Sequence, residues 1–317
     1  MANYLVTGGA GFIGSHIVFK LVSDGHTVRV IDNLSTGKKE NLSGILDKID
    51  FVQGDLTDRE TVVRVVQDID YVLHQAALPS VPRSIKDPIE TDLNNVYGSL
   101  VLLVAARDAK VKRVVQACSS SAYGDTPTLP KVETMVPAPR SPYAASKTAN
   151  ELYGCAFFHS YGLEFVGLRY FNVFGARQDP NSQYSAVIPK FVTAYIKNEQ
   201  PVVYGDGKQS RDFCYIDNVV QANLLSCTAK DAPGRIFNIA CGERIDLLDV
   251  LNLLAEYFGK KIEPRFDPTR AGDVMHSLAD IGLAREILGY DPKIFFREGL
   301  QRTVKWYQHS HNPGSGS

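Results

Sequence analysis

The sequence has few of the features that mark disulfide-rich, metal-binding or nucleic-acid-binding proteins. Its 317 residues include five cysteines, at positions 118, 155, 214, 227 and 241, with no Cys-x-x-Cys spacing. Scattered thiols in odd number favour a reduced protein over a disulfide framework or a zinc site. The formal net charge of −1 leaves no excess positive charge to hold a nucleic acid or an acidic membrane surface. We therefore expect a cytoplasmic protein with no metal, nucleic acid or membrane partner.

Long hydrophobic runs and repeats are also missing. No apolar run is long enough to span a bilayer, and no internal repeat or low-complexity segment precedes the tail. The chain enters a strand-like stretch almost at once, so we expect no signal peptide. The composition, with 44% hydrophobic and 22% charged residues, is that of an ordinary globular protein with a sizeable core.

Short apolar strands alternate with helical patterns over the first 175 residues. This alternation predicts an α/β fold with a Rossmann-type doubly wound parallel sheet, covered by helices on both faces. Strands are expected near 4–7, 27–31, 50–53, 70–74, 113–117 and 164–169, and helices near 12–24, 92–108 and 141–161.

The pattern changes after about residue 176, where the loops lengthen. Helices are expected at 185–197, 246–258, 280–288 and 296–309, and short strands near 202–204, 236–239 and 262–266. We predict a dinucleotide-binding domain over residues 1–175 with returning segments near 213–240. A smaller α/β substrate-binding domain occupies mainly residues 176–309, and residues 310–317 form a disordered tail.

A glycine-rich turn joins the first strand to the first helix. Gly8, Gly11 and Gly14 stand where the backbone must approach a pyrophosphate closely and where the helix must pack on its strand. The helix N-terminus would then face the phosphates. The turn, including Phe12 and Ile13, is therefore a candidate dinucleotide site, although a plain glycine-rich turn has the same composition.

An acidic residue closes the second strand. Asp32 lies 24 residues after Gly8, where a carboxylate can accept hydrogen bonds from the ribose hydroxyls and would repel a 2′-phosphate. This favours NAD over NADP, although Lys38 and Lys39 follow closely. The loop after the strand adds the candidates Asn33, Ser35 and Gly37.

Polar residues recur at the ends of the other strands. Asp55, Ala76 and Ser119 all fall at carboxyl ends, where open parallel sheets bind their ligands. Their neighbours Leu56, Gln75 and Ala77 join the predicted crevice. His74 lies within a strand and is more often a packed core histidine than a catalyst.

Tyr143 and Lys147 lie four residues apart on one expected helix. Ser141 can cap this helix and Pro142 suits its first turn, so both side chains share one face. A nearby ammonium favours the phenolate, which would give a base for a substrate hydroxyl. Ser119, 24 residues before Tyr143, could hold the same oxygen, although serine-rich loops also make local turns.

Two arginines in the second part of the chain could hold a diphosphate. Arg211 and Arg270 both lie in polar loops, and the guanidinium group suits bidentate contact with phosphate oxygens. Either residue alone is as readily explained as a solvated loop residue.

Together these stretches resemble the extended short-chain dehydrogenases/reductases, and within them the nucleotide-sugar 4-epimerases. The resemblance covers residues 3 to about 307. It rests on the glycine turn, Asp55-Leu56, the stretch 119–124, Tyr143-x-x-x-Lys147, the stretch 169–175 and Arg211-Asp212-Phe213.

The resemblance implies a mechanism with permanently bound NAD. Tyr143 would take the proton of the sugar 4-hydroxyl while hydride leaves C4, and the 4-keto sugar would turn over before hydride returns. Lys147 would lower the Tyr143 pKa and hold the nicotinamide ribose, with Ser119 and Ser120 as further catalytic residues. Arg211 and Arg270 would clamp the diphosphate, and Tyr204 would stack on uracil.

The resemblance also implies a set of binding residues on each side of the crevice. The cofactor set is Gly8, Gly11, Phe12, Ile13, Gly14, Asp32, Asn33, Ser35, Gly37, Asp55, Leu56, Gln75, Ala76, Ala77, Asn94, Tyr143, Lys147, Tyr170 and Val173. The UDP-sugar set is Ser80, Val81, Ser119, Ser121, Asn172, Val187, Tyr204, Arg211, Arg270 and Ser277.

Particular residues narrow the expected reaction. Related dehydratases carry Asp-Glu where Ser120 and Ser121 stand, and related decarboxylases carry Ser-Glu. The chain therefore resembles dehydratases and decarboxylases less than it resembles 4-epimerases. Strict glucose/galactose epimerases tend to have a bulky Tyr at the position where Ser277 aligns. The small Ser277 side chain leaves room here for an N-acetyl group. Met275 departs from N-acetyl enzymes, which often have Arg.

We therefore expect a 4-epimerase of UDP-N-acetylglucosamine and UDP-N-acetylgalactosamine that also accepts UDP-glucose and UDP-galactose. The alternatives are a UDP-glucose 4-epimerase with little N-acetyl activity, a net NAD-dependent oxidoreductase, and an idle nucleotide-sugar binder. The resemblance further implies a homodimer formed through helices near 92–108 and 141–161.

Overall fold

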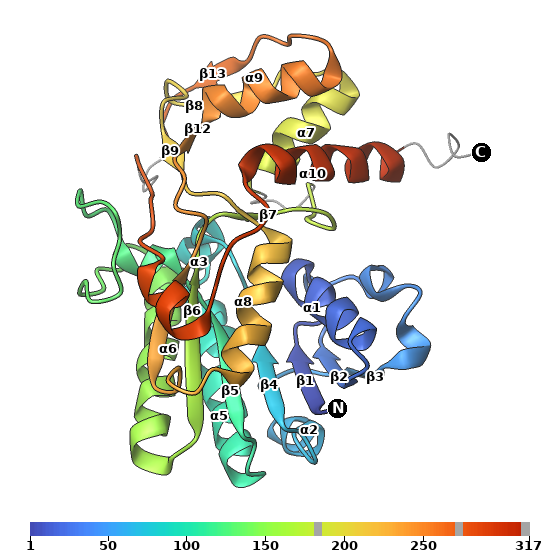
Figure 1. Ribbon diagram of the computed structural model, residues 1–317, viewed down its shortest axis with the longest axis vertical. Coiled ribbons are helices and arrows are strands. Elements are labelled where there is room, and N and C mark those ends of the chain that lie inside the picture. The colour runs from blue at the N-terminus through green and yellow to red at the C-terminus, as the bar shows by residue number, and fades with distance from the viewer. Residues whose placement is uncertain (181–185, 270–274, 312–317) are drawn as a thin grey trace.

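A seven-stranded parallel sheet forms the centre of the computed structural model, which describes residues 1–180, 186–269 and 275–311. The strand order is β11-β6-β5-β4-β1-β2-β3 (Figure 1). The strands β2 and β3 are added on one side of β1, and β4 and the later strands are added on its other side, so the strand order reverses between β1 and β4. A crevice at such a reversal is where doubly wound sheets bind ligands. The strands are β1 (Asn3–Thr7), β2 (Thr27–Asp32), β3 (Asp50–Gln53), β4 (Tyr71–His74), β5 (Arg113–Ser119), β6 (Glu164–Tyr170) and β11 (Arg235–Ile239).

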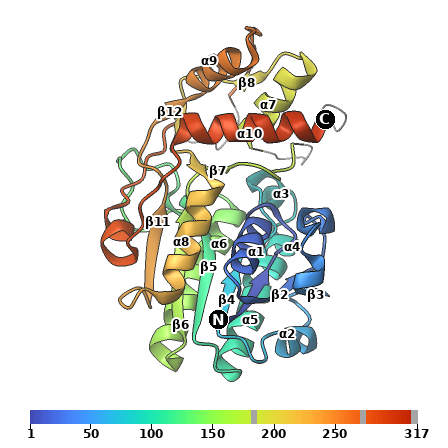
Figure 2. The same cartoon turned by 45° about the vertical axis from the view of Figure 1, so that its right-hand side comes forward.

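Helices cover both faces of this sheet, and each face has its own buried apolar cluster (Figure 2). One face carries α1 (Phe12–Ser23) and α8 (Ile216–Thr228), which pack against each other. The other face carries α2 (Arg59–Val65), α5 (Gly98–Asp108) and α6 (Pro142–Tyr161). Shorter elements in the connections are α3 (Val81–Lys86), α4 (Pro88–Asp92), η1 (Lys39–Leu42), η2 (Leu46–Lys48), η3 (Leu93–Tyr97) and η4 (Ser120–Tyr123).

A second lobe stands over the carboxyl ends of the strands (Figure 1). Three pairs of short strands join within it or at its base: β7 with β10, β9 with β12, and β8 with β13. Its helices α7, α9 and α10 pack together and continue the apolar cluster of α1 and α8. The elements are β7 (Val173–Phe174), α7 (Val187–Lys197), β8 (Val202–Tyr204), β9 (Ser210–Arg211), β10 (Cys214–Tyr215), β12 (Ile245–Asp246), α9 (Leu247–Phe258), β13 (Arg265–Asp267), η5 (Ala284–Leu288) and α10 (Phe296–His311).

The expected α/β fold and parallel sheet are confirmed, while several boundaries differ. The helix expected over 280–288 is present over 282–288, with the π turn η5 as its last five residues, and the helix expected over 92–108 contains the π turn η3 before α5. The expected tail begins too early, because α10 continues through His311. Hydrogen bonds from His309 to the carbonyl of Lys305 and from Ser310 to that of Trp306 extend its last turn. No helix of the described residues is long and apolar enough to cross a membrane.

Candidate functional site

The glycine turn after β1 is shaped by close contact between backbones. Gly8 has a φ of +66°, and a Cβ there would lie 2.7 Å from the Ala76 nitrogen. A Cβ on Gly14 would lie 2.2 Å from the carbonyl oxygen of Gly8. Helix α1 then begins with Gly11 as N-cap and no side-chain hydrogen bond to its first turn. Its first N–H groups therefore suit the phosphates of a dinucleotide.

Asp32 at the end of β2 stabilises this turn. Its Oδ2 accepts from the Ala10 N–H at 2.9 Å and its Oδ1 from the Leu34 N–H at 2.8 Å. Burial raises the pKa of Asp32, and these two hydrogen bonds oppose the rise. A Cβ on Gly37 would lie 2.8 Å from Oδ2, so Gly37 packs directly on the carboxylate. Each oxygen keeps a lone pair for a ribose hydroxyl.

The loops after β2 and β3 are joined by polar contacts. Asn33 donates from Nδ2 to Oδ2 of Asp55 at 2.7 Å, and its own Oδ1 accepts from the Ser35 N–H at 3.0 Å. Burial alone would raise the pKa of Asp55, but hydrogen bonds from Thr57 and Asn33 lower it on balance. Asp55 is therefore a fixed, ionised carboxylate beside the crevice.

These elements line a pocket of about 680 Å³ along the carboxyl ends of the strands. Of the predicted cofactor residues, Gly37 and Val173 do not line it; Gly37 lies behind Asp32, and Val173 faces the neighbouring pocket. The predicted residues that do line it are Gly8, Gly11, Phe12, Ile13, Gly14, Asp32, Asn33, Ser35, Asp55, Leu56, Gln75, Ala76, Ala77, Asn94, Tyr143, Lys147 and Tyr170.

Tyr143 and Lys147 lie on one face of α6, at the wall of this pocket. Ser141 caps the helix by accepting from the Ala144 N–H at 3.1 Å. Burial lowers the pKa of the Lys147 ammonium to about 8, and the nearby Cys118 thiol and Glu151 oppose this shift. Lys147 donates to the Ala117 carbonyl at 2.8 Å, which fixes its position beside β5.

Ser119 is a hydrogen-bond partner of the Tyr143 phenol. Burial raises the pKa of Tyr143, and the hydrogen bond with Ser119 opposes this rise. The Ser119 hydroxyl therefore favours the phenolate. The Ser119 hydroxyl also accepts from Ser121 Oγ at 2.8 Å, and Ser120 begins the adjoining η4 turn.

A smaller pocket of about 250 Å³ adjoins the first under the second lobe. Five predicted substrate or cofactor residues line it, from separate elements or loops: Asn172, Val173, Val187, Tyr204 and Arg211. Asn172 has a φ of 32°, which asparagine tolerates better than most residues. Its Nδ2 donates to the Asp212 carbonyl at 3.1 Å and to Ser277 Oγ at 3.2 Å.

Some of the predicted substrate residues line neither pocket; Ser119, Ser121 and Ser277 are among them, and Ser80 and Val81 lie at the start of helix α3. The Ser80 hydroxyl caps α3 by accepting from the Arg83 N–H at 3.2 Å, and Val81 begins that helix. Neither lines the two pockets, although the preceding Leu78 and Pro79 line the first. Arg270 lies outside the described residues.

Asp212 is a buried residue next to Arg211, which lines the second pocket, and the sequence reading did not assign it. Its carboxylate accepts from the N–H groups of Cys241, Gly242 and Ala279 at 3.0 to 3.1 Å. Burial raises its pKa to about 6. Asp212 thereby joins the end of β11 to the segment that carries Ser277. Its position directly after Arg211 was the available signal.

A buried ion pair beneath Tyr143 was also missed. Arg169 on β6 binds both carboxylate oxygens of Glu151 on α6, at 2.9 and 2.7 Å. The guanidinium carbon lies 4.5 Å from the centre of the Tyr123 ring. Glu151 follows Lys147 by one helical turn, so this pair holds the face of α6 that carries Lys147 against the sheet.

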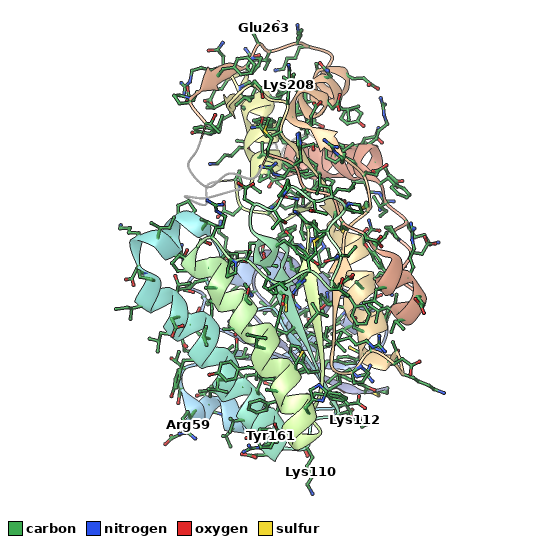
Figure 3. All side chains as sticks on the ribbon, turned by 90° about the vertical axis from the view of Figure 1, so that its left-hand side faces the viewer. Arg59, Lys110, Lys112, Tyr161, Lys208 and Glu263 are labelled. Carbon is green, nitrogen blue, oxygen red and sulfur yellow. The ribbon has the colours of Figure 1, made fainter. Side chains whose placement is uncertain are left out.

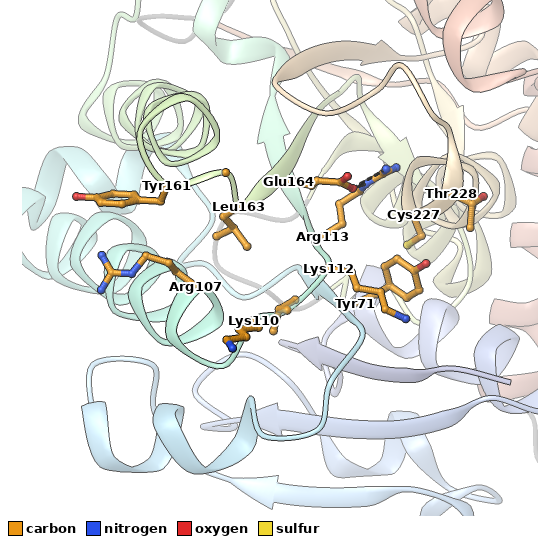
Figure 4. A pocket seen from close by; sticks show the side chains of 12 residues that line it. Tyr71, Arg107, Lys110, Lys112, Arg113, Tyr161, Leu163, Glu164, Cys227 and Thr228 are labelled. Carbon is orange, nitrogen blue, oxygen red and sulfur yellow. Dashed lines mark hydrogen bonds and ion pairs between the residues drawn. The ribbon is translucent and has the colours of Figure 1, made fainter.

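Another hollow opens at the opposite end of the sheet (Figure 4). Its cationic side chains have structural partners: Arg107 packs on Tyr161 at 4.8 Å, and Arg113 pairs with Glu164 at 2.7 Å. Lys112 and Tyr161, which line this hollow, are labelled in Figure 3 at the end of the molecule opposite the second lobe. Since it lies at the amino ends of the strands, we assign the chemistry to the other end.

The described residues contain no cluster of three His, Cys, Asp or Glu side chains that could hold a metal ion. His74 is a packed core residue, bonded to Thr7 Oγ1 at 2.7 Å and Ser99 Oγ at 2.8 Å. Burial lowers the pKa of His74 to about 3, so its ring is neutral.

Comparison with known proteins gives the same picture over the whole chain. Residues 4–240 match the model of the "NAD dependent epimerase/dehydratase family". The UDP-glucose 4-epimerase of Mycolicibacterium smegmatis is 37% identical over 308 residues, covering 96% of this chain and 98% of that protein.

Two solved structures are similar throughout. A UDP-N-acetylglucosamine 4-epimerase from Methanobrevibacter ruminantium, in complex with UDP-N-acetylmuramic acid, superposes with a TM-score of 0.94 at 42% identity, covering 98% of this chain and 99% of that chain. A Thermus thermophilus UDP-glucose 4-epimerase in complex with NAD superposes with a TM-score of 0.89 at 38% identity, covering 99% and 100% of the two chains.

Proposed function

The chain belongs to the NAD-dependent epimerase/dehydratase family and is a UDP-sugar 4-epimerase that uses NAD; from this premise, we propose that it interconverts UDP-N-acetylglucosamine and UDP-N-acetylgalactosamine. We propose that it also interconverts UDP-glucose and UDP-galactose. The observation that carries the N-acetyl activity is the small side chain of Ser277, which lies against Asn172 at the second pocket.

In this proposal the dinucleotide lies in the larger pocket and the sugar reaches the Tyr143 phenol. Bound NAD would supply the acceptor and donor for the hydride of C4. Tyr143 takes the proton of the 4-hydroxyl, and the Ser119 hydroxyl holds the same oxygen and stabilises the phenolate. Lys147, fixed on the Ala117 carbonyl, lies where its charge and donors can meet the nicotinamide ribose.

The nucleotide part of the substrate would be held by the second pocket. Arg211 at its wall suits the diphosphate, and Tyr204 suits stacking on uracil. Because these groups come from the second lobe, the nucleotide can stay bound while the sugar turns over. Both faces of C4 can then meet the same nicotinamide.

Two substrate preferences remain to be separated by experiment. A strict UDP-glucose 4-epimerase is the alternative favoured by the names of relatives such as the Mycolicibacterium enzyme. The test is to incubate purified protein with each of the four UDP-sugars, without added NAD, and to compare kcat/KM. The proposal expects epimer mixtures from both pairs. A requirement for stoichiometric NAD would instead indicate a net oxidoreductase.

The role of Ser277 is tested by a matched pair of variants. Ser277→Tyr fills the proposed space and should lower kcat/KM for the N-acetylated substrates at least tenfold relative to the plain hexoses, an effect of about 1.4 kcal/mol. Ser277→Ala keeps the space and removes only the hydrogen bond from Asn172, so both substrate pairs should change alike. Equal losses for both pairs in Ser277→Tyr would refute the size argument.

We also propose a homodimer formed through α6 and the helices before α5. The support is a group of exposed apolar side chains on this face: Ile89, Leu93, Tyr97, Leu152 and Tyr153. Sedimentation equilibrium should give twice the chain mass, and Leu93→Asp should shift it toward the monomer. The five cysteines, which form no disulfide, support the proposed cytoplasmic location.

The division of labour between the lobes is likewise a proposal. We propose that residues 1–175 with the returning segments near 213–240 hold NAD, and that residues 176–309 mainly hold the UDP-sugar. The return of the chain as α8 and β11 supports this division, since both elements pack into the first lobe.

A further inference from the structure

Residues 176–180 run along the mouth of the larger pocket, where Arg177, Gln178, Asp179 and Pro180 line it together with the glycine turn and Asp32. The segment follows β7, so it enters from the second lobe. None of the motifs that identify the dinucleotide site includes it. The contacts of this segment show what it does.

Its first residues are fastened to helix α1. The His16 Nε2 lies 2.9 Å from the carbonyl oxygen of Ala176. Burial lowers the pKa of His16 to about 4, so the ring is neutral near pH 7 and donates this hydrogen bond through Nε2–H. The Arg177 guanidinium carbon lies 4.0 Å from the centre of the Phe19 ring, and its NH1 lies 3.5 Å from Ser15 Oγ.

The middle of the segment is fastened to the second lobe. The Tyr307 hydroxyl on α10 donates to the carbonyl oxygen of Gln178. The Gln178 side chain in turn donates from Nε2 to the Val173 carbonyl at 3.2 Å. Tyr307 and the adjacent Trp306 line the same pocket, so α10 supports the segment from outside.

The segment reaches the opposite wall through one ion pair. The Lys38 Nζ lies 2.7 Å from Oδ2 of Asp179. Lys38 is held at the glycine turn by its own N–H, which donates to the Ala10 carbonyl at 2.9 Å. Since Lys38 follows Asp32 by six residues, it lies on the adenosine side of the pocket. The pair therefore joins the two walls across that half.

We propose that residues 176–180 form a clasp over the adenosine half of NAD, and that the Lys38–Asp179 ion pair is its latch. The inference rests on NAD occupying this pocket, as proposed above. An epimerase must return hydride from the same dinucleotide that received it, so slow release of the cofactor serves each turnover. The clasp also bears on cofactor choice, because Asp179 engages the lysine that could otherwise meet a 2′-phosphate.

The experiment measures cofactor exchange instead of turnover. One portion of the purified wild-type enzyme is denatured, and its NAD content is determined. A second, native portion is mixed with excess isotopically labelled NAD, and the bound label is measured over time. Asp179→Asn and Lys38→Met should each speed exchange up to about fivefold, the range measured for partly exposed ion pairs. The wild-type rate should rise toward theirs at high salt.

Two controls separate the latch from general charge effects. Lys39→Met removes the neighbouring cation, which lies 5.1 Å from the centre of the Phe51 ring, and should leave the exchange rate unchanged. The double variant Lys38→Asp/Asp179→Lys exchanges the two charges and so restores an ion pair between the same positions. Its exchange rate should return toward the wild-type rate. Asp179→Asn should also bind NADP more tightly than wild type.

The outcomes decide between the two proposals. Exchange rates of Asp179→Asn and Lys38→Met equal to that of wild type, or an equal increase in Lys39→Met, would overturn the clasp and leave the epimerase assignment intact. Wild-type protein that neither contains nor takes up NAD would overturn the pocket assignment and the clasp together.

Discussion

The two pockets of this enzyme are built in different ways. The larger pocket, where we propose that NAD binds, is formed by turns at the ends of neighbouring strands, and backbone contact decides its shape, as at Gly8 and Gly14. The smaller pocket, where we propose that the UDP-sugar binds, is lined by side chains from separate parts of the chain, such as Asn172 and Arg211. We therefore expect that NAD retention depends on backbone geometry and that substrate affinity depends on individual side chains.

The largest effect is expected at Tyr143, which lines the larger pocket. Tyr143→Phe removes the proton acceptor and should lower kcat by about 10²- to 10⁴-fold. The bound NAD should remain, because the phenol is not needed to shape the glycine turn. Rate and NAD content are measured on the same preparation, with Tyr153→Phe, an exposed tyrosine of the same helix, as control. Near-normal turnover would remove Tyr143 as the base.

Gly14→Ala tests the backbone side of the comparison. The new Cβ would lie 2.2 Å from the Gly8 carbonyl oxygen, so the turn must shift. We expect purified enzyme with most of its NAD lost, measured by absorbance after denaturation. Gly44→Ala is the control, since it has a positive φ but open space around it. Full NAD content in Gly14→Ala would show that the turn adapts.

Asn172→Asp tests the side-chain side. Aspartate keeps the size and tolerates the left-handed backbone, but it cannot donate to Asp212 and Ser277. The KM for UDP-sugars should rise about tenfold, the cost of roughly one to two lost hydrogen bonds, while NAD content stays unchanged. Asn198→Asp, another asparagine with positive φ, provides the control at 58°. Loss of NAD in Asn172→Asp would contradict the separation of the two pockets.

The smallest effect is expected from pH, through Asp212. Its pKa of about 6 means that the carboxylate is charged at pH 7.5 and mostly protonated below pH 6. A protonated oxygen cannot accept from the N–H that faces it, so the segment carrying Ser277 should loosen on acidification. We expect KM to rise a few fold (roughly threefold) between pH 7.5 and 5.5, with kcat changing less.

Asp212→Asn serves as the reference for that experiment. Asparagine does not titrate, so the KM of this variant should be high and nearly constant across the same range. A wild-type KM that does not change over this interval, or a variant that keeps the wild-type slope, would assign the pH dependence to another group.

The sequence predicts the strands and turns around the larger pocket well, because the information for them is local. A strand, a glycine turn and a strand-end Asp32 can each be recognised within a few residues, and parallel pairing brings the strand ends together. The type of helix is predicted less accurately. The helix expected over 280–288 forms over 282–288 and ends before Gly289 at φ +68°, but its last five residues are the π turn η5. The π turn η3 has no residue pattern that distinguishes it from α-helix.

The remaining features depend on contacts between distant residues. Asp212 receives hydrogen bonds from segments about 30 and 67 positions away, and Asp179 meets Lys38 across the pocket. No periodicity or short motif encodes such pairs.

The way in which β11 rejoins the main sheet limits how this protein can be taken apart. β11 pairs with β6, and α8 just before it packs on α1, so the chain crosses from one lobe to the other and back again. A gene fragment ending at residue 175 would encode a sheet with β6 as a bare edge and α1 without its neighbour. The two halves are therefore not interchangeable modules: new substrate specificities must arise by altering loops within one continuous chain, and not by exchanging whole lobes between relatives.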